Sequence, residues 1–566
     1  MSHRVVSYEL LAGRYAEAGV PLMSRRSKIV NPKSKIVNPK PVFNKFILKF
    51  SVLVFVLYFL ITCKSSKNTG AKNKPEKLPP KREVRAVWIA TVDNIDWPSR
   101  KNLSPEEQRQ EFVKLLLAHK KTGINTVYVQ VRAAADAFYA KGSEPWSEWL
   151  TGKQGKAPEP FYDPLEFMIN ECHRRGIEFH AWLNLNRAAH RVSKSIASDN
   201  ISKKHPEWIL DYDGYKLFNF GLPEVRDYIT DVTINIVKNY DVDGIHFDDY
   251  FYPYSVAGQI LKDSEAFKQY GNNFASKEDW RRNNIDLIIK QISDGITATK
   301  PYVKFGISPF GAWRNKKDDP TGSDTQAGQT SYDNLFADTK KWTKAGWIDY
   351  MIPQIYFSTK HNKVPFKTLT NWWLQHTYGR HLYIGQGAYK VGQDTDKSWQ
   401  NPEEFSDQMA FLREQSAVSG SAFFSSKSLI NNKLGFADSL QNNFYKYPAL
   451  PPTMPWKDNV PPRPPQGLTI NDLSKGIELN WNTPTASKDG ETASYYAVYR
   501  FDANDIPNLN DPRRIIGFCY DKQGWLADRT AIQGKKYTYL VTAFDRLHNE
   551  SEATKTQIMV KNFKKK

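Results

Sequence analysis

Short apolar runs alternate with longer amphipathic segments from residue 85 to about residue 426, and this alternation constrains the fold more than any other feature of the chain. It is typical of repeated βα units on a parallel sheet. About eight runs occur: RAVWIAT (85–91), TVYVQVR (126–132), EFHAWLN (178–184), GIHFDDY (244–250), KFGISPF (304–310), YMIPQIY (350–356), LYIGQGAY (382–389) and GSAFFSS (420–426). Eight strands close a (β/α)8 TIM barrel, which we predict here. A doubly wound open sheet is the competing layout, but no Gly-rich phosphate loop follows the first run.

The segments between the runs carry helix boundary signals. Ser104 can cap a helix whose capping box is closed by Glu107 and whose end is marked by Gly123. Asp163 and Gly176 repeat this pattern. Further helices are predicted over residues 223–240, 276–300, 332–346, 366–378 and 401–420.

The composition changes after the predicted barrel domain, residues 83–450. PPTMPWKDNVPPRPP, residues 451–465, is a Pro-rich linker, and residues 466–566 break into alternating strands that predict a small all-β sandwich. This segment resembles a fibronectin type III domain, with Trp481 as a core tryptophan and Tyr537 at the position of the tyrosine corner. It contains no catalytic constellation, so we expect a spacer or a site for an envelope protein partner.

The amino-terminal region explains the basic net charge. Residues 1–82 hold 17 Lys and Arg against 3 Asp and Glu, which accounts for +14 of the formal charge of +19. The charge is therefore not spread over the fold, which argues against nucleic-acid binding. The apolar run at residues 50–61 ends in LITC and resembles a bacterial lipoprotein signal, with Cys63 lipidated; a plain uncleaved anchor is the alternative. Residues 1–63 would then be a basic extension and signal, and residues 64–82 a linker at the membrane.

Polar and aromatic side chains gather at the carboxyl ends of the runs, where barrel enzymes place their active sites. The expected substrate-binding set is Asp93, Arg132, Asp136, Trp182, Asn184, Arg187, His246, Tyr250, Arg314, Gln354, Tyr356 and Gln386. Carboxylates, amides and aromatic faces together favour a carbohydrate cleft, in which hydrolysis needs an acid and a second group that meets positive charge at the anomeric carbon. The histidines lack clear metal-ligand spacing, so neither a metal nor a cofactor is expected.

The pair Asp248 and Asp249 forms the expected catalytic centre. In a regular strand His246, Asp248 and Tyr250 share one face, so only one of the two aspartates can point into the barrel. We assign Asp248 as the leading carboxylate and Asp249 as its partner or orienter, because crowding should raise the proton affinity of one of them. Asp249 could instead cap the following loop, and the arginines could form structural salt bridges rather than hold substrate.

Several long motifs resemble one family in the same order. REVRAVWIATVDNIDWPS, AWLN with Arg187, VDGIHFDDYFYP and ISPFGAWRN look like glycosyl hydrolase-like family 10 domains of bacterial envelope lipoproteins. The family includes a divisome-associated enzyme that cleaves peptidoglycan glycan strands stripped of peptide. The resemblance implies a lipid-anchored glycoside hydrolase of the cell envelope, facing the periplasm or in the outer membrane, with a similar substrate. The alternatives are a non-catalytic glycan-binding lipoprotein, a hydrolase of a partly deacetylated exopolysaccharide, and a scaffold built on the C-terminal domain.

Overall fold

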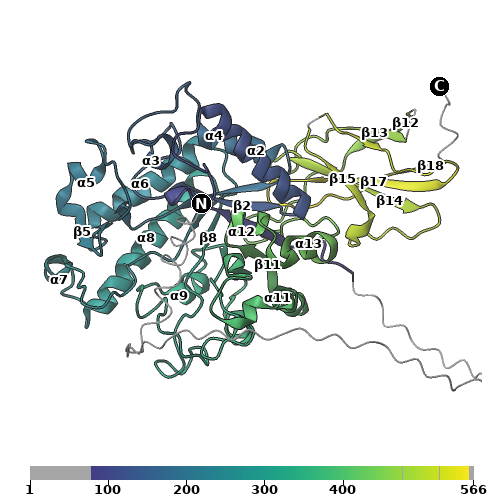
Figure 1. Cartoon of the computed structure of the whole chain (residues 1–566). Coiled ribbons are helices and arrows are strands. Elements are labelled where there is room, and N and C mark those ends of the chain that lie inside the picture. Colours follow the sequence, from purple (N-terminus) through teal and green to yellow (C-terminus); the bar gives the residue numbers. More distant parts are fainter. Residues whose placement is uncertain (1–77, 474–475, 522, 560–566) are drawn as a thin grey trace, which may run out of the picture. The chain divides into compact units, whose positions relative to one another are not determined.

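Eight parallel strands close into a barrel, in the order β1-β11-β10-β9-β8-β7-β3-β2 (Figure 1). The computed structural model describes residues 78–473, 476–521 and 523–559. The strands are β1 (Val84–Ile89), β2 (Thr126–Arg132), β3 (Glu178–Leu183), β7 (Gly244–Phe247), β8 (Lys304–Ile307), β9 (Tyr350–Met351), β10 (His381–Gln386) and β11 (Val418–Phe423). Each lies in one of the eight predicted runs or overlaps it. The TIM barrel is therefore confirmed, and closure excludes the open sheet.

Helices lie on the outside of the barrel (Figure 1), and the first two long ones begin where their capping residues predict. The Ser104 side chain accepts from the Glu107 amide in a reciprocal capping box, and Gly123 ends the helix with φ of 93°. Asp163 caps the next helix by accepting from the Leu165 and Glu166 amides. The longer helices are α2 (Pro105–Thr122), α4 (Pro164–His173), α6 (Pro223–Asn239), α8 (Lys277–Thr299), α10 (Phe366–Leu374) and α11 (Glu403–Glu414). Shorter ones are α3 (Glu148–Thr151), α5 (Ile201–Lys204), α7 (Ser264–Tyr270), α12 (Ser426–Ile430) and α13 (Phe436–Ser439).

One predicted helix is much shorter than expected. Residues 332–346 form only α9 (Thr339–Lys344), because Asp338 caps its start by accepting from the Lys341 amide. Upstream, the Thr330 hydroxyl donates to Asp333 over 3.0 Å and accepts from its amide, which closes a turn instead of a helix. The prediction for 401–420 also ran too far, since α11 ends at Glu414 and β11 begins at Val418.

The barrel domain has two separate cores, one inside the ring of strands and one between the strands and the helices. Its interior is filled by large rings, among them Trp88, Tyr128 and Tyr350, all at most 2% exposed. Between the strands and the helices lies a larger aliphatic core that includes Ile245 and Phe247 of β7. Alternate residues of each strand thus serve the two cores, which is why the runs are apolar throughout.

A small antiparallel sheet interrupts the βα alternation after β3. It consists of β4 (Arg187–Ala189), β5 (Ile209–Tyr212) and β6 (Tyr215–Phe218) in the order β4-β6-β5. The turn between β5 and β6 holds Asp213 and Gly214 at φ of 47° and 76°, the combination that a two-residue hairpin requires.

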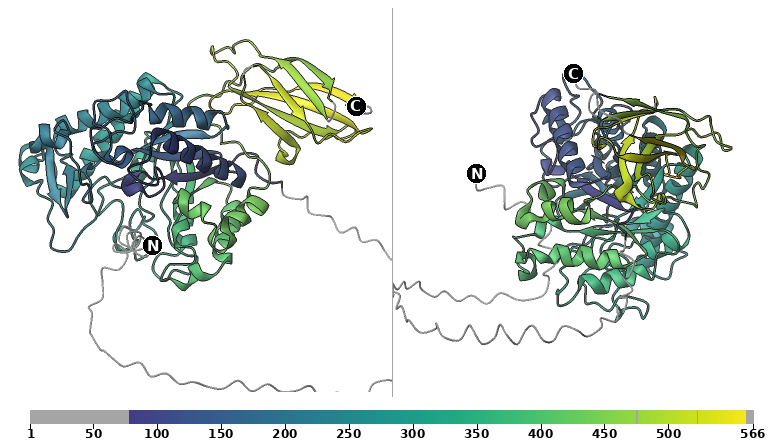
Figure 2. Two further views of the ribbon diagram at one scale, coloured as in Figure 1. Left: turned by 45° about the horizontal axis from the view of Figure 1, so that its top comes forward. Right: turned by 90° about the vertical axis from the view of Figure 1, so that its right-hand side faces the viewer.

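The C-terminal strands form a two-sheet sandwich, drawn in yellow-green to yellow in Figure 2. One sheet contains β12 (Gln466–Asp472), β13 (Ile477–Asn482) and β16 (Trp525–Asp528); the other contains β15 (Ile515–Cys519), β14 (Tyr495–Asp502), β17 (Lys536–Phe544) and β18 (Thr554–Met559). The all-β sandwich is as predicted. Trp481 is 4% exposed in the core, and the Tyr537 hydroxyl accepts from the Ile532 amide over 3.2 Å, five residues upstream.

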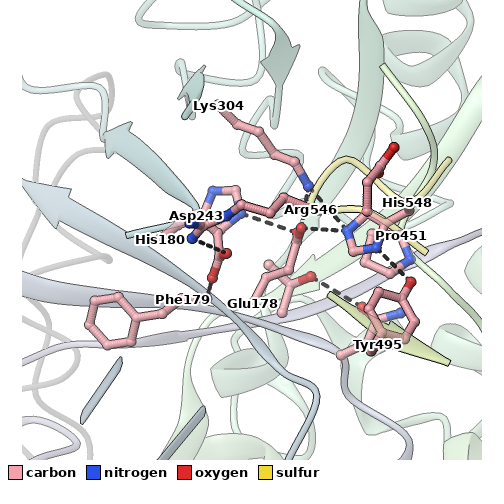
Figure 3. Close-up of polar contacts among 12 residues, drawn as sticks. Glu178, Phe179, His180, Asp243, Lys304, Pro451, Tyr495, Arg546 and His548 are labelled. Atoms are coloured by element: carbon pink, nitrogen blue, oxygen red, sulfur yellow. Dashed lines mark hydrogen bonds and ion pairs between the residues drawn. The ribbon is translucent and has the colours of Figure 1, made fainter. Parts of the chain in front are cut away.

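Polar contacts join the sandwich to the amino-terminal end of the barrel (Figure 3). Glu178, the first residue of β3, binds Lys304 of β8 and accepts from His548 Nε2 over 2.7 Å. The other ring nitrogen of His548 hydrogen-bonds the Tyr495 hydroxyl over 2.8 Å. Arg546 adds an ion pair of 2.6 Å to Asp241. This end lies opposite the strand ends at which the active site was predicted.

The predicted lipoprotein signal falls outside the described residues. This applies to the apolar run 50–61, to Cys63 and to most of the linker 64–82. Across residues 78–559, apart from the gaps noted above, no helix has both the length and the apolar character needed to cross a membrane.

Candidate active site

Asp248 and Asp249 lie where β7 stops. The last residue of the strand is Phe247, whose ring packs against Phe305 with centroids 5.2 Å apart. Because the strand ends at Phe247, the strict alternation of faces does not extend to the two aspartates. The restriction to one inward aspartate therefore does not apply. Asp248 is 7% and Asp249 is 2% exposed, and the charge of Asp248 contributes to raising the pKa of Asp249.

Donors from two strand ends hold Asp248. Trp182 Nε1 donates to its Oδ2 over 3.0 Å, and Asn184 Nδ2 donates to the same oxygen over 3.2 Å. The Tyr250 amide donates to Oδ1 over 3.2 Å. Burial raises the pKa of Asp248 above 3.8, but the positive charge of Arg187 and these donors oppose the shift. The surroundings therefore favour the ionised form of Asp248 more than that of its neighbour.

Asp249 is held by fewer donors. The Tyr254 hydroxyl donates to its Oδ2. Burial, and secondarily the charge of Asp248, raise the pKa of Asp249 to about 7, with Tyr254 and Gln354 opposing the rise. A carboxyl group with this pKa is partly protonated at neutral pH, as a general acid must be.

An aromatic pocket opens beside the pair. It is lined by Arg187, Tyr212, Tyr215, Tyr250 and Tyr254, among others. The Arg187 guanidinium lies 4.1 Å from the centroid of the Tyr250 ring. The Asn184 side chain accepts from the backbone amide of Arg187 over 2.9 Å and so fixes the backbone at this residue. Aromatic rings and a buried cation line this concavity, whose volume of about 30 Å³ is far below the roughly 300–1,000 Å³ of typical ligand pockets.

One wall of this pocket is the hairpin formed by β5 and β6, which was not predicted from the sequence. Tyr212 and Tyr215 flank the Asp213-Gly214 turn, in a stretch of alternating apolar residues. An Asp-Gly pair in that setting is a strong hairpin signal and would have predicted β5 and β6.

More rings lie at the ends of the later strands. Tyr356 packs edge to face with Tyr389 at 6.0 Å and stacks near Phe424 at 6.2 Å. Asp249 and Asp248 both contribute to raising the pKa of Tyr356, after burial, which places the ring within electrostatic reach of the pair. Gln354 donates to the Ser308 carbonyl over 3.0 Å and also reaches Asp249.

Two predicted arginines form salt bridges instead of facing the site. Arg132 binds both oxygens of Glu144, at 2.7 and 2.6 Å, and donates to the Asn184 carbonyl over 2.5 Å. Arg314 pairs with Asp333 and Asp319 at 2.9 and 3.1 Å. For both, the salt-bridge alternative fits the structure, and Arg132 acts by supporting Asn184.

Of four other predicted residues, three hydrogen-bond groups other than the two aspartates and one is exposed. His246 is 0% exposed inside the barrel and accepts from Trp88 Nε1 over 3.1 Å. Asp136 is 2% exposed and accepts from the Ser147 hydroxyl over 2.6 Å. Gln386 is buried and donates to Gln408, while Asp93 is exposed in a 3-10 turn after β1. A polar side chain in or after a strand can be buried or exposed. Its polar character alone therefore does not predict contact with the two aspartates.

The pair itself is not part of a metal-ligand cluster. Among the described residues, the only group of three or more His, Cys, Asp and Glu side chains close enough to share an ion is Asp458, Glu491 and Asp545. These belong to the linker and the C-terminal sandwich.

The sequence was compared with known families and proteins. The sequence model of the family described as Glycosyl hydrolase-like 10 matches residues 83–401. Glycosyl hydrolase YngK of Bacillus subtilis (strain 168) is 46% identical over 520 residues, which cover 91% of this chain and 99% of that protein. Glycosyl hydrolase DigH of Escherichia coli (strain K12) is 37% identical over 370 residues, 61% of this chain and 83% of that protein.

Among solved structures, the PgaB (BpsB) glycoside hydrolase domain from Bordetella bronchiseptica matches with a TM-score of 0.43 and 14% identity, over 63% of this chain and 98% of that one. The family match covers seven of the eight barrel strands, from β1 to β10, and includes both aspartates. Both relatives are named glycosyl hydrolases. The chain belongs to the glycosyl hydrolase-like 10 family.

Proposed function

We propose that the chain hydrolyses glycosidic bonds in an amino-sugar polysaccharide, with peptide-free peptidoglycan glycan strands as the substrate. One observation carries the proposal: Asp248 and Asp249 lie together at the end of β7, where the pKa of Asp249 is raised to about 7, while the charge of Arg187 and the donor Trp182 oppose the rise of the pKa of Asp248. Two carboxyl groups with separated proton affinities are what glycoside hydrolysis requires.

The two groups would divide the reaction. Protonated Asp249 donates its proton to the glycosidic oxygen as the C1–O bond breaks, and ionised Asp248 meets the positive charge that develops at the anomeric carbon. A water molecule then adds to that carbon and returns a proton to Asp249. In a substrate with 2-acetamido groups, Asp248 could instead accept a hydrogen bond from the acetamido N–H. The carbonyl oxygen of the acetamido group would then attack the anomeric carbon.

Arg187 supports the choice of peptide-free strands. It is 5% exposed, it lines the pocket, and no carboxylate of the described residues lies within 4.0 Å of its guanidinium. A buried cation without an ion-pair partner favours an anionic ligand. Removal of the peptide leaves each muramic acid with a free lactyl carboxylate. In an intact strand this carboxyl group is joined to the peptide as an uncharged amide.

The decisive experiment is mass spectrometry of products from purified, peptide-free strands. We expect new reducing ends with the wild-type chain, and binding without cleavage for Asp248→Asn. Asp231→Asn, an exposed change on α6, is the matched control and should cleave normally. Strands bound but left intact by the wild-type chain would instead make it a glycan-binding protein.

The substrate is tested with three polymers at equal concentration. Peptide-free strands, strands whose lactyl carboxylates are reduced to alcohols, and a partly deacetylated exopolysaccharide are compared by the release of reducing ends. We expect the order of preference to begin with the unmodified strands, and Arg187→Gln to remove the difference between the first two. Faster cleavage of the exopolysaccharide would overturn this choice of substrate.

We also propose that the chain is lipid-anchored in the bacterial envelope through Cys63. The apolar run before this cysteine supports the proposal. Cys63→Ala should release the protein from the membrane fraction and abolish incorporation of a labelled fatty acid, and an unchanged membrane fraction would favour the uncleaved anchor.

A further inference from the structure

Three carboxylates from separate segments meet at the joint between the barrel and the sandwich. Asp458 lies in the linker before β12, Glu491 lies in the loop before β14, and Asp545 directly follows β17. One oxygen of each lies within 4.8 Å of the others. Residues far apart in the sequence have thus been brought together with charges of the same sign, which is unfavourable unless something compensates them.

In the described part of the chain, no cationic side chain forms an ion pair with these three carboxylates. No Lys or Arg side chain there lies within 4.0 Å of any of the three carboxylates. Asp545 is 0% exposed, and although its Oδ1 accepts from the Asn549 amide over 2.9 Å, its Oδ2 has no hydrogen-bond partner. A buried carboxylate oxygen without a donor costs free energy and indicates a missing ligand.

The protein also fixes the positions of the carboxylates. The Asn549 side chain donates to Asp458 Oδ2 over 2.7 Å, and the Val460 amide donates to Asp458 Oδ1 over 2.9 Å. Burial, with Asp458 and then Glu491, raises the pKa of Asp545 to about 6. Two of the three carboxylates, Asp458 and Asp545, are thus fixed in place by hydrogen bonds from the protein.

We propose that Asp458, Glu491 and Asp545 bind a Ca²⁺ ion. Three carboxylates without a nitrogen or sulfur donor form a hard ligand set, which favours Ca²⁺ or Mg²⁺ over transition metals. Ca²⁺ accepts carboxylates in a flexible arrangement, whereas Mg²⁺ demands near-ideal octahedral geometry and is seldom held by an all-protein cage, so three carboxylates from separate segments suit Ca²⁺ better. Asp458 and Glu491 are only partly buried, so water can complete the shell.

The ion would fasten the joint. It would tie the linker to two loops of the sandwich, one of which also carries Arg546 and His548, the residues that bind Asp241 and Glu178 of the barrel. The site is independent of the glycan site, which lies at the other end of the barrel.

The test is calorimetric titration of the full-length chain, freed of metal with EGTA, with CaCl2 and separately with MgCl2. We expect about one Ca²⁺ per chain, with an affinity on the order of 10⁻⁴ to 10⁻³ M, and a higher melting temperature in CaCl2 than in EGTA. Asp545→Asn keeps the shape and the bond to Asn549 but removes a ligand charge, so it should weaken Ca²⁺ binding at least tenfold. Glu552→Gln, an exposed change nearby, should bind as the wild type does.

Three results would overturn the proposal: no heat and no shift in melting temperature up to about 10 mM CaCl2, Asp545→Asn binding as the wild type, or tighter binding of Mg²⁺ than of Ca²⁺. If Asp545→Asn does not fold, as judged by circular dichroism, Glu491→Gln at the partly exposed position replaces it with the same expectation.

Discussion

Trp182 Nε1 donates to Asp248 Oδ2 over 3.0 Å, so a ring of the barrel interior positions the leading carboxylate of the candidate site. Trp182 is 6% exposed, and its ring belongs to the interior core. The indole is thus held by packing, and the carboxylate that it binds is fixed at the mouth of the barrel. Such preorganised donors are a main source of rate in enzymes.

Trp182→Phe should therefore lower kcat with little change in KM. A hydrogen bond to a charged group contributes about 1.5–3 kcal/mol, which corresponds to roughly 10- to 100-fold in rate. Trp88→Phe is the matched control, because Trp88 makes the same kind of bond, over 3.1 Å, to His246 and not to the aspartates. Steady-state kinetics of both variants decide the matter, and an equal loss in the two would show that the effect is general to the barrel interior.

The pH profile should report the proton on Asp249. Its pKa is about 7, so the protonated form that donates to the glycosidic oxygen is lost as pH rises, and kcat/KM should fall above about pH 7. Tyr254→Phe removes a hydrogen bond that lowers this pKa, so the alkaline limb should move to higher pH. Tyr212→Phe is the control, since its hydroxyl donates to the Tyr254 carbonyl and not to Asp249. A limb that stays in place in Tyr254→Phe would remove Asp249 from the acid role.

The barrel could be predicted from the sequence because its strands are buried on both faces and therefore read as continuous apolar runs. The place of Asp248 and Asp249 at a carboxyl strand end of the barrel could also be predicted, because the two residues lie near the end of the fourth apolar run. Their catalytic role stays a prediction. The hairpin β5–β6 was not predicted because it does not belong to the alternation of strands and helices, although Asp213-Gly214 indicated a turn. The length of α9 was overestimated because Asp338 caps from within the predicted helix.

Side-chain partners were the part that the sequence could not supply. Arg132 and Arg314 follow strands as substrate-binding residues would, but their carboxylate partners come from later loops, and only the folded chain decides that pairing. The same holds for His246, whose ring lies against Tyr128 at 4.4 Å inside the barrel. A polar side chain in a barrel strand can lie either in the core or at the mouth of the barrel. The alternation of apolar and polar residues in the sequence does not distinguish the two positions.

The Arg132–Glu144 pair should be structural. Both side chains are at most 2% exposed, so Arg132→Met leaves a buried carboxylate without its cation and should cost about 3–5 kcal/mol of unfolding free energy. Adding Glu144→Gln should recover part of that loss, because the unpaired charge is gone. Urea unfolding of the two single variants and the double variant measures the coupling. Additive losses would mean that the pair contributes no coupling energy.

Glu178 and His548 should make the fold sensitive to acid. Burial lowers the pKa of His548 below 6.5, so below that pH the unfolded chain binds a proton that the folded chain does not, and stability falls as pH falls. Burial alone would raise the pKa of Glu178, but Lys304 and then His548 hold it well below 4.5, so its contribution is present above that value and is lost at lower pH. Melting temperatures at pH 7.5 and about pH 5.5 should therefore differ less in His548→Gln than in the wild type, because glutamine does not titrate. His205→Gln, at a side chain 41% exposed, should leave the difference unchanged. An undiminished difference in His548→Gln would show that the acid sensitivity arises elsewhere in the chain.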